Sequence, residues 1–116
     1  MAHAVPGSLH IATDVIADIA GLTALESYGV VGMAGPLLRD GIATLLPRTK
    51  LRKGVDVKFG AEGARVDLYV IVEHGVNIAT VAKNLEDTLT FMIHDLTDVP
   101  LEAVVVHVQG VKVREK

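Results

Sequence analysis

The chain has 116 residues, half of them apolar, which is enough for one buried core and excludes a disordered or multidomain protein. It has no cysteine, so disulfides and thiolate metal sites are excluded, and this is typical of a reducing compartment. The formal net charge of -3 argues against nonspecific binding to nucleic acid, which needs clustered cations.

Membrane insertion and secretion are also disfavoured. The first residues show no basic segment followed by an apolar run. The most apolar stretch, GVVGMAGPLL, is much shorter than the roughly 20 residues that a transmembrane helix requires. We therefore expect a cytoplasmic chain with no span of its own.

The first third of the chain predicts a strand, a helix and a strand. We expect an irregular lead over residues 1–7 and an edge strand from Ser8 to Ala12. Thr13 then caps a helix with Ile16 and Ala20 on its inner face. A short strand follows from Gly29 to Met33.

The middle of the chain, Pro36 to Lys53, is predicted to be irregular apart from a brief helix that Pro36 opens and Pro47 ends. Alternating apolar residues predict a strand from Val55 to Phe59. GAEG, residues 60–63, then reads as a hairpin turn.

The stretch from Arg65 to Gly110 organises the chain. Its first strand alternates, with Val66, Leu68, Val70 and Val72 on one face and Asp67, Tyr69, Ile71 and Glu73 on the other. A helix with one apolar stripe follows, capped by Asn77. A valine-rich strand from Leu101 to Gln109 closes the unit.

These elements predict one α+β domain over residues 8–111, followed by a short tail at 112–116. It is a two-layer sandwich, in which a largely antiparallel or mixed sheet of four to five strands carries two main helices on one face.

No catalytic, cofactor or metal site can be assembled from the residues. The histidines at positions 3, 10, 74, 94 and 107 lack the spacing that places two metal ligands on one element. Ser8 and Ser27 do not lie in a nucleophile elbow, and the glycines of GVVGMAG lack the order of a dinucleotide fingerprint. An enzyme would require several of Asp67, Glu73, His94 and His107 to meet in one pocket.

The segment RTKLRK holds the chain's cationic cluster, which consists of Arg48, Lys50, Arg52 and Lys53. Such runs are usually solvated loops, and without aromatic residues they make a poor nucleic-acid site. Attraction to anionic headgroups or to an acidic protein segment is the functional alternative.

Three stretches resemble the alkaline shock protein family of bacterial envelope-stress and general-stress proteins. They are IATDVIADIAGLTALESYGVVGMAG, KGVDVKFG and VDLYVIVEHGVNIATVAKNLEDTLTFMIHDLTDVPLEAVVVHVQGV, in the family's order from Ser8 to Val111. The combination of YVIVEHG, IATVA and VHVQGV makes the resemblance specific. Two departures are that His74 stands where the family often has Tyr, and that the charged terminal extensions of many members are nearly absent.

The resemblance implies a small cytoplasmic stress protein without enzymatic activity or cofactor. Some members are held at the membrane by a separate anchor protein, so the inner face of the cell membrane is an expected location. From the strands that are apolar on both faces we expect a scaffold or interaction protein that forms homo-oligomers. The alternative is a small-molecule-binding regulatory domain of the βαβ type, with its cleft between helix and sheet.

Overall fold

The computed structural model describes the backbone of residues 6–35 and 44–113, and the side chains from residue 12 onward within those ranges. Two long helices and four strands follow one another with a short 3₁₀ helix between the first two strands. In chain order they are α1 (Pro6–Glu26), β1 (Val30–Met33), η1 (Arg48–Gly54), β2 (Val55–Gly60), β3 (Gly63–Glu73), α2 (Ile78–Thr97) and β4 (Leu101–Lys112).

Strand β3 is the centre of the sheet. Along one edge it pairs antiparallel with β2 and, further along, with β1. Along its other edge it pairs parallel with β4, from Ala64 opposite Leu101 to Glu73 opposite Lys112. The α+β class is confirmed, and the sheet is mixed because α2 carries the chain from β3 back to the starting end of its parallel neighbour.

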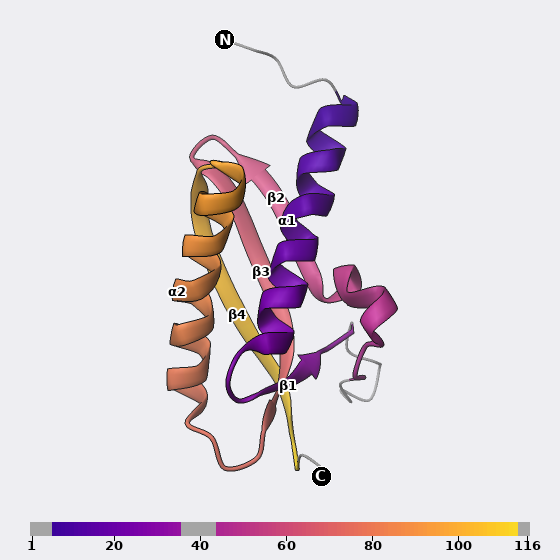
Figure 1. Cartoon of the computed structure of the whole chain (residues 1–116), viewed down its shortest axis with the longest axis vertical. Coiled ribbons are helices and arrows are strands. Elements are labelled where there is room, and N and C mark those ends of the chain that lie inside the picture. Colours follow the sequence, from indigo (N-terminus) through magenta and orange to yellow (C-terminus); the bar gives the residue numbers. More distant parts are fainter. Residues whose placement is uncertain (1–5, 36–43, 114–116) are drawn as a thin grey trace.

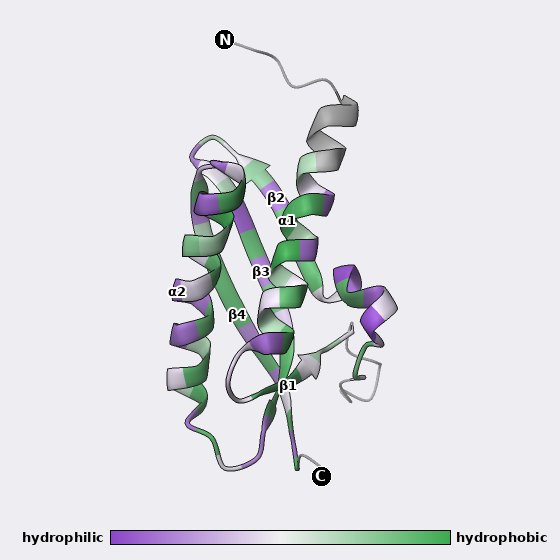
Figure 2. Ribbon diagram, viewed as in Figure 1, coloured by the Kyte–Doolittle hydropathy of each residue, from purple (hydrophilic) through white to green (hydrophobic). Residues whose placement is uncertain are grey.

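The two long helices lie on the same face of this sheet (Figure 1). The core between the layers contains Val66, Leu68, Val70 and Val72 from β3, all 0% exposed, which confirms the predicted inner face. Against them pack Val81, Leu85, Leu89 and Ile93 from α2 and Ile16, Ala20 and Ala24 from α1. Hydrophilic residues recur along the outward side of α2 (Figure 2). The other face of the sheet has no helix over it among the described elements.

The start of α1 corrects the sequence analysis. The edge strand predicted for Ser8–Ala12 and the cap at Thr13 are wrong, because the helix already begins at Pro6 and includes Pro6 and Gly7 of the expected lead. Two apolar residues separated by one position fit a strand and a helical turn equally well over so short a stretch. Proline also suits the first turn of a helix. Residues 1–5 lie outside the described part of the chain.

The middle segment is regular only in part. The helix predicted between Pro36 and Pro47 falls mostly outside the described residues, and its last part is wrong because Leu45 forms an extended bridge with Ala34. RTKLRK, expected to be irregular, forms the 3₁₀ helix η1. Leu51 anchors η1, since it is buried and its Cβ lies 3.0 Å from where a Cβ on Gly21 of α1 would stand.

The turns and caps on either side of β3 follow the sequence closely. The GAEG hairpin is confirmed, with Ala61 and Glu62 as the two turn residues between β2 and β3. The predicted cap of α2 is also confirmed, because the Thr80 amide donates to Asn77 Oδ1 at 3.0 Å. The helix ends at Thr97, and Asp98 after it is the C-cap, in a left-handed conformation with φ of 57°.

Candidate functional site

Polar side chains from β3 and β4 meet on the face of the sheet opposite the two long helices. Arg65 donates from Nε and Nη2 to the two carboxylate oxygens of Asp67 at 3.0 and 3.2 Å. His107 lies on the neighbouring strand β4, with its Nε2 2.9 Å from Asp67 Oδ1. The ring of Tyr69 stacks on the His107 imidazole, with ring centroids 4.6 Å apart and planes 12° from parallel. Asp67 is only 7% exposed, so these neighbours enclose its charge.

The electrostatics of this group follow from its contacts. The hydrogen bond from Arg65 lowers the pKa of the Asp67 carboxyl, the contact with His107 lowers it further, and burial opposes both. The same hydrogen bond raises the pKa of Arg65. Asp67 is therefore held ionised by partners on its own strand and on the parallel strand.

The structure brings together two of the four candidate acid-base residues, Asp67 and His107. His94 is exposed on α2, in the other layer of the molecule, and Glu73 lies at the end of β3. An aspartate and histidine pair can activate a hydroxyl nucleophile. However, the hydroxyl of Ser27 is engaged elsewhere, because it donates to the Thr23 carbonyl of α1 at 2.9 Å. Within residues 12–35 and 44–113, no three potential metal-binding side chains from His, Asp or Glu form a group.

Sequence reasoning missed the contact between Asp67 and His107 because it left the alignment of β3 and β4 open. One signal was available. A strand, helix and strand in succession favours parallel neighbours. In a parallel pair, Asp67 and His107 fall on the same polar face of adjacent strands.

The cationic cluster lies on η1, against α1. Arg52 donates from Nε and Nη2 to the Asp18 carboxylate at 2.7 and 2.9 Å, and Asp14 lies 3.4 Å from its Nη1. The hydrogen bond from Arg52 lowers the pKa of Asp18. Arg52 therefore docks η1 onto α1, and its charge is paired within the chain although its side chain is 55% exposed.

The other three cations of the cluster, Arg48, Lys50 and Lys53, are exposed. None of the three forms an ion pair with another residue of the described chain. They line a hollow of about 420 Å³ together with Asp18 and Leu22 of α1. The result is a concave, cationic surface on one flank of the molecule.

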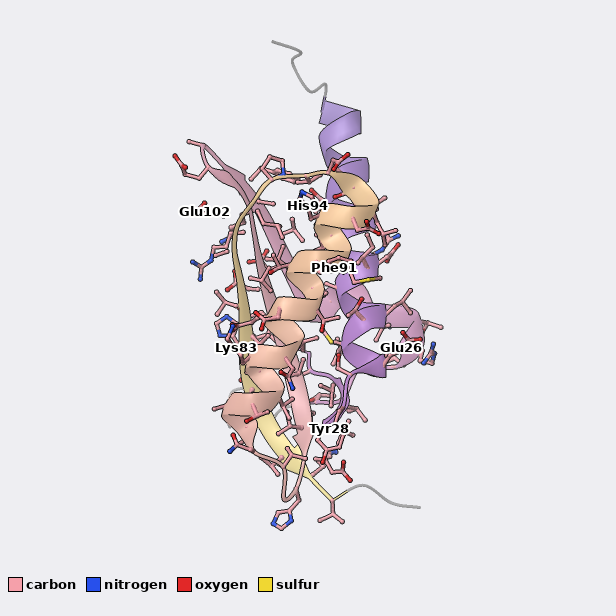
Figure 3. The ribbon with its side chains drawn as sticks, turned by 60° about the vertical axis from the view of Figure 1, so that its left-hand side comes forward. Glu26, Tyr28, Lys83, Phe91, His94 and Glu102 are labelled. Atoms are coloured by element: carbon pink, nitrogen blue, oxygen red, sulfur yellow. The ribbon has the colours of Figure 1, made fainter. Side chains whose placement is uncertain are left out.

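A second hollow, of about 330 Å³, lies between α1 and α2. Its lining includes Glu26 from the end of α1, Tyr28 from the turn after it, and Asn84 and Met92 from α2. Tyr28 is 80% exposed and Phe91, on the outer side of α2, is 65% exposed (Figure 3). The hollow is thus between the two helices, whereas a regulatory domain was expected to have its cleft between helix and sheet.

None of the helices within the described ranges combines the length and the apolar character that crossing a bilayer would take.

Comparison with known proteins gives a consistent picture. The model of the alkaline shock protein 23 family, described as having a "cell envelope-related function", matches residues 2–113. The uncharacterized protein YloU of Bacillus subtilis is 33% identical over 108 residues, which are 92% of this chain and 90% of YloU. The uncharacterized protein Spy1614 of Streptococcus pyogenes serotype M6 is 36% identical over 108 residues, covering 92% of this chain and 89% of Spy1614.

Among solved structures, a variant of MamM CTD matches with a TM-score of 0.50 at 11% identity. The match covers 92% of this chain and 99% of that one. A cadmium form of MamM CTD also has a TM-score of 0.50 at 11% identity, and covers 91% of this chain and 99% of that one. At this identity the likeness shows the fold alone.

Proposed function

This chain belongs to the alkaline shock protein 23 family, and from that premise we propose that it is a non-catalytic protein of the envelope stress response. It acts as a scaffold that binds copies of itself and a partner at the inner face of the cell membrane. The observation that carries this proposal is the one-sided sheet. Among the described elements the helices lie on one face only, and the partly exposed side of the other face around Tyr69 and His107, together with the long strand β4, is available for contacts between proteins.

The polar group on the open face supports a non-catalytic role. The Asp67 carboxylate accepts both hydrogen bonds of the Arg65 fork and also contacts His107. Its acceptor capacity is thus largely filled from within the protein. These residues join β3 to β4, which stabilises the sheet edge where a partner would bind.

Self-association is tested by size-exclusion chromatography with light scattering over a wide concentration range. We expect a mass above that of one chain that falls on dilution, because β4 exposes a strand edge. A single-chain mass at every concentration would remove self-association from the proposal.

For the envelope partner we propose the cationic hollow as its contact, with Arg48, Lys50 and Lys53 meeting an acidic segment of a membrane-anchored protein. A hollow with a volume of about 420 Å³ suits a peptide segment better than a flat bilayer. Arg52 contributes indirectly, since its bonds to Asp18 fix η1 in place.

This contact is tested with a fluorescent fusion in cells and with anionic vesicles in solution. We expect Arg48→Glu, Lys50→Glu and Lys53→Glu together to move the fusion from the cell periphery to the cytoplasm, while the purified protein fails to bind vesicles with or without the changes. Peripheral localisation of the triple variant would refute this contact. Vesicle binding that the triple variant loses would assign the surface to lipid instead.

The hollow between α1 and α2 favours a second candidate function, a small-molecule-binding regulatory domain. Its volume of about 330 Å³ lies at the lower end of the range for ligand pockets, and it mixes apolar with polar groups such as Asn84 and Glu26. A thermal-shift screen with metabolites separates the two functions, because a ligand of the native state raises Tm. A compound whose shift disappears in Asn84→Ala would favour this second candidate.

A further inference from the structure

Strand β4 is the longest strand of the sheet and lies at its edge. It runs for 12 residues and pairs with β3 on one side. No strand of the described chain pairs with its other side. An edge strand directs alternate N–H and C=O groups away from its sheet, where they can bond to another strand.

The central part of β4 lacks the features that usually block edge pairing. Residues 103–108 are Ala-Val-Val-Val-His-Val, with no proline, lysine or acidic residue. Their register against β3 is unbroken, since the two shifts fall at Glu102 and at Gln109. All six are partly exposed, although three of them pack on the core. Such a strand is a template for pairing.

We propose that β4 pairs antiparallel with β4 of a second copy of this chain, which joins two four-stranded sheets into one. The inference rests on the self-association proposed above and specifies its surface. A two-fold axis perpendicular to the sheet relates the copies, because this symmetry keeps both pairs of helices on the same side. The contact is closed, so it forms dimers.

Charge complementarity argues for a second copy and for the antiparallel direction. Glu102 lies near one end of β4 and Lys112 near the other, and His107 is midway between them. Antiparallel pairing centred on His107 places Glu102 beside Lys112 of the second copy, and this pair forms twice. Parallel pairing in register would instead place like charges beside each other, which is unfavourable.

The same alignment matches apolar residues on the helix-covered side. Val106 falls opposite Val108 of the second copy, and both valines already pack against the core. The two cores would therefore meet along β4 as a continuous apolar layer. Glu102 is exposed on the side of the sheet away from α1 (Figure 3). Its Oε1 lies over the sheet, 3.4 Å from where a Cβ on Gly60 would stand, so the exposed side chain has to turn outward to meet Lys112 of the second copy.

Disulfide trapping tests the alignment, because the chain has no cysteine of its own. Glu102→Cys and Lys112→Cys are purified separately and oxidised alone or after mixing and subunit exchange. We expect a covalent dimer in the mixture and none from either variant alone. In a dimer of one variant with itself, the two thiols lie ten residues apart along the paired strands, about 33 Å at about 3.3 Å per residue. That distance is far beyond disulfide reach. The control is Glu26→Cys, at the end of α1, which is oxidised in the same way and measures crosslinking by random collision.

Charge reversal tests the pair without a covalent bond. Glu102→Lys or Lys112→Glu alone should raise the dimer dissociation constant about tenfold, because each turns two attractive pairs into two repulsive ones. The double variant Glu102→Lys and Lys112→Glu should recover the original value. Glu26→Lys and Lys58→Glu make the same charge changes away from β4 and should leave it unchanged.

The outcomes separate this inference from the proposed function. If light scattering shows a dimer but the cysteine mixture stays uncrosslinked and the charge-swapped double variant is not restored, self-association uses another surface and the β4 pairing is wrong. If the unmodified chain remains a single-chain species throughout, self-association itself fails. Equal crosslinking of the mixture and of the single variants would also overturn the alignment.

Discussion

At the scale of single residues, Asp67 is the position where burial and charge conflict most. Asp67 is 7% exposed and its carboxylate is ionised, and this is tolerated because Arg65 and His107 both contact it. We expect Asp67→Asn to lower the free energy of unfolding by about 1 to 2 kcal/mol, because a neutral amide pairs less well with both partners. Chemical denaturation measures this. Asp56→Asn, on the exposed side chain that faces Lys58 at 3.7 Å, is the control and should change stability by less than about 0.5 kcal/mol.

The same residue predicts how stability depends on pH. Its pKa lies below the ordinary value of 3.8 in the folded protein, so ionisation favours the folded state above that value. Stability should therefore be fully present near neutral pH and should be lost as pH falls from about 5 through the folded-state pKa. Asp18, whose pKa is lowered by Arg52, acts in the same direction. Denaturation curves between pH 7 and pH 3 should show a smaller loss for Asp67→Asn than for the unmodified chain. Equal losses would mean that Asp67 is not coupled to folding.

Residue roles were predictable only where a local pattern determined them. The inner valines of β3 followed from strict alternation, and the Asn77 cap from its position before an apolar stripe. The pairing of Arg52 with Asp18 spans 34 positions in the chain, and that of Asp67 with His107 spans 40. Neither could be read from spacing, because each depends on which elements become neighbours in the fold.

Among the elements, α2 depends on its first turn for stability. Asn77 Oδ1 accepts the Thr80 amide, one of the four amides that a helix start leaves without an intrahelical partner. Asn77→Ala should cost about 1 kcal/mol of stability, measured by thermal or chemical unfolding. Asn77→Asp is the matched control and should retain or slightly raise stability, since it still caps and places a negative charge at the positive end of the helix dipole. A loss as large as that of the alanine variant would show that the cap does not act through this bond.

Two glycines separate the effect of backbone conformation from that of space. Gly63 opens β3 with φ of 128°, and a Cβ there would stand 2.5 Å from the Pro100 carbonyl oxygen. Gly75, in the connection to α2, has φ of 94° and nothing within 4 Å of such a Cβ. Gly75→Ala should therefore cost about 1 kcal/mol from conformation alone. Gly63→Ala should cost about 2 kcal/mol or more, because conformation and clash combine. Similar unfolding midpoints for the two variants would contradict the clash.

The predicted element boundaries were wrong where the same few residues fit both the strand period and the helix period. The stretch from Ser8 to Ala12 alternates like a strand, but it continues the helix that runs to Glu26. The long unit from β3 to β4 was predictable because its patterns extend over eight residues or more, enough to distinguish a period of 2 from one of 3.6. The order of strands was not, since it depends on how β1 and β2 divide one edge of β3 between them.

At the scale of the whole molecule, the sheet is asymmetric in two ways. Within the part of the chain that the structure describes, the helices lie on one face, and β3 has neighbours on both edges whereas β4 has one. The first asymmetry could be expected from two helices and a short chain. The second required the topology, and it directs attention to β4 as the surface where one copy can extend another.

Amide hydrogen exchange at two protein concentrations would test whether the outer edge of β4 is the contact between two copies. The β3 amides should exchange slowly at both concentrations, because neighbours on both edges bond them. Within residues 103–108 of β4, the amides bonded to β3 should be slow throughout. The alternate amides that face outward should exchange fast when the protein is dilute and slowly when it is concentrated. The comparison is internal, since adjacent residues of one strand serve as control and probe. If the protein dimerises at the higher concentration while the outward amides of β4 stay fast, the strand edge is not the contact, and the cationic hollow or the exposed face around Tyr69 becomes the surface to test.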